Sequence, residues 1–430
     1  MGSWTTYSFN EIIEDISDGG TPSRSKQSYF DGTIPWIVID DIQDYIYDTK
    51  EKLTESGLKA CSSKLWPKGT IILSTGATIG EVGIAQVETA TKQGICGIRV
   101  NESLIDNVFF MYYLKYIKNQ LLSYAQGSTI KEIRPNVIRG FSIYAPKSID
   151  EQHVIGEVLS KVDVSIKQTQ KLIEKYNRIK VGLMHELLTK GIDEQGNIRS
   201  EETHKFKVEE GLKIPNDWNA ESLPFFCDIQ NGKAFSSNDY NSEEGIRLVK
   251  PGNLAPTGFT DWNNKHVAFL PKHFWGKNKD YQVFENELLM NLTAQSLEDE
   301  FLGRVCITSP GTRCLLNQRI ARIKPKNINL DYLFWAFKSK FFRNYVDTMP
   351  SGTKVQHLYN SDLENAVIAA PKSLEEQKKI AKTLFDLNKL INELHSKVHK
   401  LQRQKKGLMQ DLLTGEKRVT NLVLEDVGVR

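Results

Sequence analysis

The 430-residue sequence lacks the features of several common classes of protein. It has five cysteines and no Cys-x-x-Cys pair. An odd number of scattered cysteines predicts reduced thiols in a cytoplasmic protein, and it argues against a disulfide framework or a zinc site. Every apolar run falls short of the roughly 18 residues that a membrane span needs, so no membrane partner is expected.

Signatures of catalysis are also missing. The sequence has no phosphate-binding G-x-x-x-x-G-K-[ST] and no G-x-S-x-G nucleophile elbow. It also has no Asn/Asp-Pro-Pro-aromatic motif of the kind that holds a target adenine in amino-methyltransferases, and its eight histidines are scattered. We therefore expect no catalytic residue, no metal site and no cofactor bound by this chain.

The sequence does contain a long internal repeat. "APKSIDEQHVIGEVLSKV" begins at Ala145, and "APKSLEEQKKIAKTLFDL" begins at Ala370. An ungapped alignment of Ala145–Thr189 with Ala370–Thr414 has 18 identities in 45 positions, and both copies end in Gly-Leu-Met-x-x-Leu-Leu-Thr. Weaker matches continue upstream in the same order. The chain therefore predicts two tandem halves, each with a variable block followed by a shared segment.

The shared segment predicts one long helix in each half. Ser148 with Glu151, and Ser373 with Glu376, have the spacing of a capping box. Apolar residues then follow in alternating steps of four and three, which favours an antiparallel coiled coil between the two helices. The predicted seam consists of Ile155, Leu159, Val162, Ile166, Ile173, Tyr176, Leu183 and Leu187 in the first helix and Ile380, Leu384, Leu387, Ile391, Leu394, Val398, Leu401, Leu408 and Leu412 in the second.

Two lysines, Lys180 and Lys405, interrupt the seam at equivalent positions. A polar seam residue can fix the register of two helices or contact a third partner. A lysine can also bury its stem and extend its charge into water, and the sequence leaves these alternatives open.

The variable blocks predict mixed α/β domains. Thr70–Ser74 and Gly140–Ala145 are β-branched runs between turn residues, as in strands. Asp106–Ala125 and Leu330–Val346 are amphipathic and rich in aromatics, which we expect in helices that face the core. The predicted fold class is α+β: two mixed α/β domains joined by two long helices, with a pseudo-two-fold internal repeat.

The predicted domain boundaries follow from the repeat. The first domain covers 1–146, and a helical region follows at 147–192. A polar linker at 193–214 leads to the second domain at 215–371. The second helical region covers 372–418, and a tail covers 419–430.

This order of motifs resembles the specificity subunit of type I restriction-modification enzymes. The matching features are a proline followed by Glu-Gln at each helix start, the shared helix ending, and Gly-Ser or Gly-Thr shortly before each helix. The stretch Asp18–Ile42 is similar to a common start of a target recognition domain. The corresponding stretch Asn231–Tyr240 matches that start poorly, so the two domains are expected to recognise different sequences.

The resemblance implies a non-catalytic subunit. Each target recognition domain would bind one half of a bipartite, asymmetric site in double-stranded DNA. The paired helices would set the spacer between the half-sites and dock two methyltransferase subunits. Those subunits would bring S-adenosylmethionine for adenine-N6 methylation, and restriction subunits that join the complex would bring ATP and Mg²⁺.

Loops with cationic, amide or hydroxyl side chains beside turn glycines are the candidates for DNA contacts. Base recognition needs forked donors, and phosphate contacts need Lys, Arg or hydroxyl groups. In the first domain the candidates are Thr21, Ser23, Arg24, Lys26, Ser74, Thr75, Thr78, Ser128, Lys131 and Arg134. In the second domain they are Lys233, Ser236, Lys250, Asn253, Asn291, Gln295, Asn317, Arg319, Thr353, Lys354 and His357.

Two other functions remain open at this point. The chain could be a structural coiled-coil adaptor that recognises no DNA, or an enzyme that acts alone. Salt-dependent DNA binding by the complex with the methyltransferase would argue against the adaptor, because phosphate contacts make affinity fall with salt. Activity of the purified chain with S-adenosylmethionine or Mg²⁺ would support the enzyme.

Overall fold

The computed structural model describes residues 3–76, 78–126, 131–241, 244–263, 267–295, 300–349 and 356–419. The chain forms two compact units. The first unit contains Met1–Lys171 with His395–Arg430, and the second contains Leu172–Leu394. Each unit therefore contains one variable block and parts of both shared segments.

A five-stranded sheet with the order β2-β9-β6-β7-β4 is the framework of the first unit. The first four strands are antiparallel, and β4 pairs with β7 in parallel. A smaller sheet with the order β5-β3-β8 adjoins it. The strands are β2 (Ile13–Asp18), β3 (Phe30–Ile37), β4 (Tyr45–Ile46), β5 (Lys52–Leu53), β6 (Ile71–Ser74), β7 (Val82–Ala85), β8 (Ala90–Thr91) and β9 (Ile95–Val100).

The second unit repeats this arrangement. Its main sheet has the order β14-β22-β18-β20, also antiparallel, so these strands correspond to β2, β9, β6 and β7. A second sheet has the order β16-β15-β21-β17, and its parallel β15–β21 pair corresponds to β3–β8. The strands are β14 (Cys227–Asn231), β15 (Ile246–Val249), β16 (Ala268–Leu270), β17 (Gln282–Val283), β18 (Leu288–Asn291), β20 (Val305–Ile307), β21 (Cys314–Leu316) and β22 (Ile320–Pro325).

An antiparallel strand pair leads into each long helix. Strand β1 (Trp4–Ser8) pairs with β10 (Ser142–Pro146) in the first unit, and β13 (Trp218–Ser222) pairs with β24 (Val367–Pro371) in the second. The register places Trp4 opposite Pro146 and Trp218 opposite Pro371. The predicted internal repeat is thus present in strand order and in register.

The predicted aromatic helices are each interrupted once. The first becomes α3 (Asn107–Tyr116) and α4 (Lys118–Ser123), and the second becomes α9 (Leu330–Ala336) and α10 (Lys340–Asp347). The second break occurs because the Ser339 side chain accepts a hydrogen bond from the Phe342 N–H and starts a new helix. Their aromatics are in the core, as predicted; Phe109, Phe110, Tyr112, Tyr332, Phe334 and Trp335 are all at most 1% exposed.

The remaining elements are short. The α-helices are α1 (Phe9–Ile12), α2 (Glu55–Lys59), α5 (Pro135–Arg139), α7 (Leu223–Phe226), α8 (His273–Lys277) and α11 (Asn360–Glu364). The 3₁₀ turns are η1 (Gln27–Tyr29), η2 (Ile39–Asp41), η3 (Ser237–Asp239), η4 (Pro251–Asn253) and η5 (Lys279–Tyr281). Strand β19 (Thr293–Ala294) pairs with β23 (Gln356–His357).

The segment predicted as a linker contains a β-hairpin. Strand β11 (Phe206–Glu209) pairs with β12 (Leu212–Pro215). The two residues between them, Glu210 and Gly211, both have positive φ, at 47° and 74°. A two-residue turn of this kind matches the twist of the flanking strands, which explains why a polar segment is ordered here.

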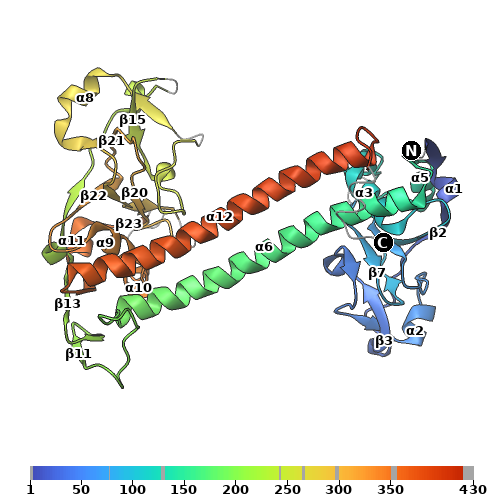
Figure 1. The fold of residues 1–430 in the computed structure, drawn as a ribbon, viewed down its shortest axis with the longest axis horizontal. Helices are drawn as coiled ribbons and strands as arrows, with labels where there is room; N and C mark the ends of the chain where they lie inside the picture. The colour runs from blue at the N-terminus through green and yellow to red at the C-terminus, as the bar shows by residue number, and fades with distance from the viewer. Residues whose placement is uncertain are drawn as a thin grey trace. The chain divides into compact units, whose positions relative to one another are not determined.

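The two long helices are present as predicted: α6 spans Ile149–Thr189, and α12 spans Leu374–Leu413 (Figure 1). In the first unit Asp163 pairs with Lys405 at 2.7 Å, while Glu151 pairs with Arg418 beyond the helix end. In the second unit Lys180 donates to Asn388 at 3.2 Å. The predicted seam residues are all buried or half-buried, whereas a regular coiled coil stays a prediction.

The predicted capping boxes form only in part. The Glu151 N–H donates to Ser148 Oγ, and the Glu376 N–H donates to Ser373 Oγ, both at 3.3 Å. The glutamate carboxylates, which we expected at the helix caps, instead bind an arginine and a tryptophan. A bidentate, charge-assisted pair with a guanidinium is stronger than a hydrogen bond to one backbone amide. Each carboxylate therefore binds the arginine and not the amide at the helix cap.

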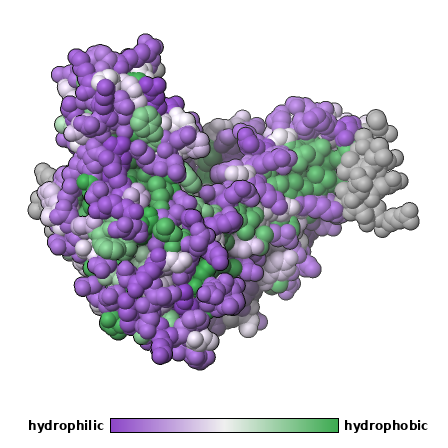
Figure 2. Space-filling view, turned by 60° about the vertical axis from the view of Figure 1, so that its left-hand side comes forward, coloured by the Kyte–Doolittle hydropathy of each residue, from purple (hydrophilic) through white to green (hydrophobic). Residues whose placement is uncertain are grey.

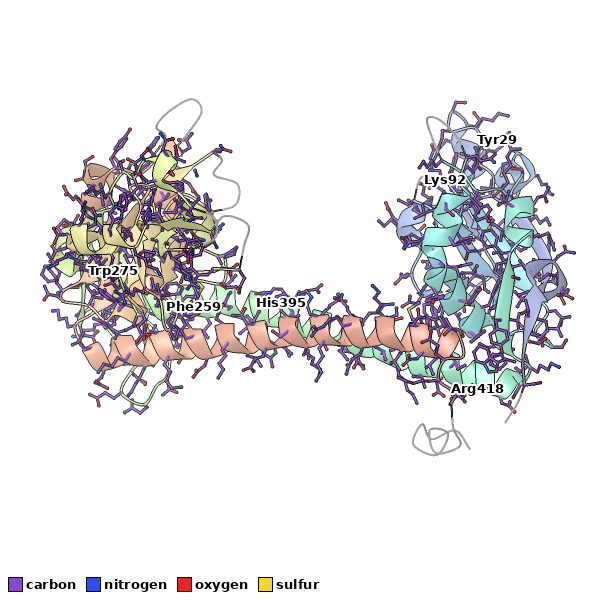
Figure 3. The ribbon with its side chains drawn as sticks, turned by 90° about the horizontal axis from the view of Figure 1, so that it is seen from above. Tyr29, Lys92, Phe259, Trp275, His395 and Arg418 are labelled. Carbon is purple, nitrogen blue, oxygen red and sulfur yellow. The ribbon has the colours of Figure 1, made fainter. Side chains whose placement is uncertain are left out.

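The two carboxylates have equivalent surroundings. Glu151 accepts from Trp4 Nε1 at 3.2 Å and from Arg418 Nε at 2.8 Å. Glu376 accepts from Trp218 Nε1 at 3.3 Å and from Arg199 Nη2 at 3.0 Å. We call these Trp–Glu–Arg groups the first and second clamps. Each clamp ties the segment that follows one long helix to the start of the other, and Arg418 lies just past the end of α12 (Figure 3).

Among the described residues, no helix is both long and apolar enough to cross a membrane. The face in Figure 2 is mostly hydrophilic. The five cysteines are free thiols; Cys96, Cys227, Cys306 and Cys314 are buried, and Cys61 is half-buried. Burial raises the pKa of the Cys227 and Cys306 thiols to about 12, so these thiols are protonated and inert at neutral pH.

Candidate nucleic-acid interface

Loops that are far apart in sequence meet at one edge of the first unit's sheet, where β2 and β6 end and β9 begins. The backbone of Gly19 donates to Ile95 O at 2.9 Å. Gly76 donates to Gly94 O at 3.0 Å, and Ile133 donates to Thr75 O at 2.8 Å. We call residues 19–26, 75–76, 78, 92–94 and 131–134 the first loop edge. Backbone hydrogen bonds hold these loops together.

The second unit forms an equivalent edge where β14 and β18 end and β22 begins. Gly232 donates to Ile320 O at 3.0 Å. Leu292 donates to Arg319 O at 2.9 Å, and Leu358 donates to Leu292 O at 2.9 Å. We call residues 232–237, 292–295, 317–319 and 356–358 the second loop edge. Because the strand order is the same in both units, the same four loops meet at both edges.

The first loop edge brings together most of the candidates predicted in the first domain. Thr21, Ser23, Arg24, Lys26, Thr78, Lys131 and Arg134 are exposed. Ser74 and Thr75 are fully buried. Ser74 Oγ donates to Thr78 O and accepts from the Glu81 N–H at 2.8 Å, and Thr75 Oγ1 donates to Asp18. Ser74 and Thr75 therefore shape the loop and are not carried into the contact set proposed below.

Two cations of this edge lie against aromatic rings. The Arg24 guanidinium lies 4.9 Å from the Phe30 ring and forms a bidentate pair with Glu51. Lys26 Nζ lies 5.0 Å from the Tyr29 ring, which Figure 3 labels. Contacts with an aromatic face hold a flexible cation in one orientation. Arg24 would have to exchange Glu51 for a phosphate or a base edge in order to contact DNA.

A carboxylate beside the first loop edge was not singled out from the sequence. Asp18 lies at the end of β2, and burial together with Glu132 raises its pKa, while Thr75 and Arg134 oppose that shift. Asp18 is half-buried and accepts from Thr75 Oγ1 at 3.3 Å. A carboxylate can also accept from the amino group of cytosine in the major groove. No local sequence signal marks Asp18, because Thr75, Glu132 and Arg134 reach it only through the fold.

The second loop edge also gathers predicted residues. Lys233, Ser236, Gln295 and Arg319 are exposed, and Lys250 and His357 are half-buried. Lys250 lies outside the four loops, with its Nζ 5.5 Å from the Tyr240 ring, and burial lowers its pKa. Ser128, Thr353 and Lys354 lie outside the described residues.

Three predicted asparagines are structural. Asn253 and Asn291 are fully buried, and Asn317 is 6% exposed. Asn291 donates to Thr293 O and Phe301 O at 2.8 Å, and Asn253 accepts from the Lys250 N–H at 2.9 Å. Asn317 accepts from the Arg319 N–H at 3.1 Å. Their amides hold loop backbone, so we do not propose them as DNA contacts.

Two arginines of the second unit were not singled out from the sequence. The Arg247 guanidinium lies 5.2 Å from the Trp262 ring, and Arg313 lies 4.4 Å from the Trp275 ring. Figure 3 labels Trp275. Arg313 is exposed, and Arg247 is half-buried. Arg247 lies on β15, Arg313 directly precedes β21, and Trp275 lies in α8. The fold brings each arginine to its ring, and no local motif relates the two residues of either pair.

The repeated framework, with differing polar side chains at two equivalent loop edges, defines a two-domain recognition protein. Residues 1–177 and 215–402 match the family of type I restriction modification DNA specificity domains, and the chain belongs to this family. Its role is DNA sequence specificity, and the family members are non-catalytic subunits of a type I restriction-modification enzyme.

The chain is similar over nearly its whole length to curated members. It is 26% identical to the specificity subunit of the type I restriction enzyme MjaVIII from Methanocaldococcus jannaschii, covering 97% of this chain and 94% of that protein. The MjaIX specificity subunit of the same organism has the same identity and coverage. A crystal structure of the type I restriction-modification S subunit from M. genitalium has a TM-score of 0.60 at 16% identity, covering 97% of both chains.

Proposed function

We propose that each loop edge binds one half of a bipartite, asymmetric site in double-stranded DNA. The observation that carries this proposal is the repeat of four loops on one framework with different side chains. The first edge presents Arg24, Lys26, Lys131 and Arg134, whereas the second presents Lys233, Ser236 and Arg319. A shared framework fits the DNA backbone, which has the same geometry at both half-sites. Different polar side chains fit different bases.

Within each edge, cations and hydroxyls have separate expected roles. Arginine forks pair with guanine edges, whereas lysines and hydroxyls pair with phosphates. We propose Arg24, Arg134 and Arg319 for base contacts. For phosphate contacts we propose Thr21, Ser23, Lys26, Thr78, Lys131, Lys233 and Ser236. The proposed set is completed by Lys250, Gln295 and His357. Three further candidates stay predictions from the sequence: Ser128, Thr353 and Lys354.

The long helices are the proposed spacer and docking surface. Their shared segments are the part common to both halves, so one kind of partner could bind both. Several apolar residues of α6 face solvent: Val164, Leu172, Ile179 and Val181 are 41–69% exposed. These exposed apolar side chains are spread along α6 between Val164 and Val181, where a partner protein could cover them. We propose that two methyltransferase subunits dock on these helices.

The complex would take its cofactors from its partners. Methyltransferase subunits would bring S-adenosylmethionine, and restriction subunits that join would bring ATP and Mg²⁺. Because its substrate would be cellular DNA, the complex would work in the cytoplasm.

A base-resolution map of N6-methyladenine tests this proposal. Cells that express the cognate methyltransferase are compared with and without this chain. We expect methylation of one bipartite motif that disappears when the chain is deleted. A methylation map that does not change on deletion, in cells that contain the assembled complex, would contradict the proposed role.

A further inference from the structure

A small cationic pocket lies in the second unit, outside the predicted contact loops. Its volume is about 100 Å³, and it lies between β20 and the junction of α9 and α10. Three cations, Arg304, Lys338 and Arg343, line it together with the carboxylate of Glu300. The described lining residues therefore have a formal charge of +2, a sign that suits an anion.

Arg343 is the most constrained of the three cations. Its side chain is 8% exposed, and Nη1 donates to Leu302 O at 2.8 Å. Among the described residues, Nε and Nη2 have no hydrogen-bond partner. The Asp347 carboxylate forms an ion pair with Nη2 at 3.6 Å, which is longer than a hydrogen bond. A buried guanidinium with two donors that make no hydrogen bond is costly unless a ligand accepts from them.

Lys338 is held at the pocket by aromatic rings. Its Nζ lies 4.7 Å from the Phe334 ring and 5.7 Å from the Trp335 ring. Burial lowers the pKa of Lys338 to about 8, with Lys180 and Arg304 adding to the effect and Cys306 and Glu300 opposing it. Lys338 is therefore still mostly protonated at pH 7, and an anion in the pocket would stabilise that charge.

The equivalent region of the first unit balances its cations. There Lys118 stands at the position of Arg343 and Glu81 at the position of Arg304, and Lys118 Nζ pairs with Glu81 at 2.5 Å. The second unit thus has a cation, Arg304, where the first has a carboxylate. The carboxylate that pairs with Lys118 has no counterpart at that position of the second unit.

We propose that the pocket of Arg304, Lys338 and Arg343 binds a phosphate group. Phosphate offers several acceptor oxygens for Nε and Nη2 of Arg343, which make no hydrogen bond among the described residues, and arginine pairs with phosphate in bidentate fashion. The phosphate could be free in solution or part of a DNA backbone. The DNA source rests on the proposed function, whereas the free-phosphate source does not.

Thermal unfolding of the full chain in phosphate tests the pocket. Phosphate at about 10 mM is compared with chloride at equal ionic strength, and we expect phosphate to raise Tm by about 3 °C. Lys338→Met keeps the apolar stem and should lose the phosphate-specific rise. Lys338→Arg keeps the charge and should retain it, as should the control Lys277→Met, which changes an exposed lysine of α8.

The Tm of each variant in chloride reports its folding and separates loss of binding from loss of structure. The absence of a phosphate-specific rise in the unmodified chain would overturn the proposal. An equal rise in a folded Lys338→Met variant would overturn it too.

A second arm identifies the source of the phosphate, using the complex with the methyltransferase and cognate DNA. If the pocket holds a DNA phosphate, Lys338→Met lowers the slope of log affinity against log salt by about 1, and DNA suppresses the response to free phosphate. If the pocket holds free phosphate, the slope is unchanged and the response persists with DNA bound. Failure of DNA binding by the unmodified complex would count against the proposed function alone, because the first arm needs no DNA.

Discussion

At the scale of single residues, the two clamps differ in burial although their chemistry is the same. Arg199 and Glu376 are both 8% exposed, whereas Arg418 is 31% exposed. Gly191 has φ of +63°, and a Cβ there would lie 2.3 Å from Glu376 Oε1, so only glycine lets the chain pass the second clamp. Burial should therefore decide how much each clamp contributes to stability.

Removing the arginine of the buried clamp should be the more damaging change. Arg199→Met leaves Glu376 buried without its cation and should lower the free energy of unfolding by about 3 kcal/mol. Arg418→Met is the matched control, because the Arg418 side chain is already 31% exposed, and it should cost about 1 kcal/mol. Urea unfolding of both variants measures the difference, and equal losses would contradict the role given to burial.

A second residue-scale prediction concerns pH. Burial would raise the pKa of Asp44, but Lys115 and Lys167 outweigh it and hold that pKa at about 2, below the ordinary value of 3.8. Asp44 therefore adds stability above about pH 4, and this stability is lost as the pH falls towards 2. Asp44→Asn should cost about 3 kcal/mol at pH 7.

Unfolding measured between pH 7 and pH 3 tests this dependence. The cost of Asp44→Asn should shrink as the pH falls below about 4. The control Asp40→Asn changes an exposed carboxylate and should stay within about 0.5 kcal/mol of the parent at each pH. A cost of Asp44→Asn that does not vary with pH would rule out the ion pairs as its source.

At the scale of elements, the helix seam explains the two lysines that interrupt it. Lys405 pairs with Asp163 and lies 5.3 Å from the Tyr112 ring, and Lys180 donates to Asn388. Both lysines contact the opposite long helix, which supports the register role over a purely solvated side chain. Their partners are equivalent positions of the repeat, so the two contacts pin the same register in each unit.

Lengthening both long helices should lengthen the unread spacer of the DNA site. Insertion of one heptad into α6 and one into α12 preserves the seam and adds about 10 Å. At about 3.4 Å per base pair, the methylated motif should gain about three base pairs of spacer. A heptad in α6 alone would misalign the seam and should abolish methylation. Base-resolution methylation mapping measures the spacer. An unchanged spacer in an active double variant would show that the helices do not set its length.

At the scale of the whole molecule, the repeat makes each domain a separate recognition unit. Each variable block has its own core, with Phe109 and Phe110 in one cluster and Tyr332 and Trp335 in another. The first loop edge is built entirely from residues 19–134, and the second from residues 232–358. One domain should therefore be replaceable without rebuilding the other.

A domain exchange tests whether the two domains recognise DNA independently. Residues 1–146 are replaced by the matching block of a relative that has a different first domain. We expect one half of the methylated motif to change and the other half to stay the same, because the second loop edge is untouched. Methylome sequencing of cells with each version measures both halves. A change in both half-sites would show that the two domains do not recognise DNA independently.

The sequence by itself determined the repeat, the two long helices, their buried seam and the aromatic core. These features depend on local spacing, since a helix presents its apolar residues every three to four positions whatever surrounds it. The two halves could also be recognised as members of one family from motifs at the helix ends.

The tertiary structure alone decided which loop residues face solvent and which partners they have. Polar side chains in loops are candidates for ligand contacts, yet the side chains of Ser74, Asn253 and Asn291 form hydrogen bonds with loop backbone. Arg199 meets Glu376 across 177 positions of sequence. Such contacts depend on the order of the strands and on how the chain connects them. These features bring together residues that no local periodicity relates. The contacts could therefore be found only in the folded chain.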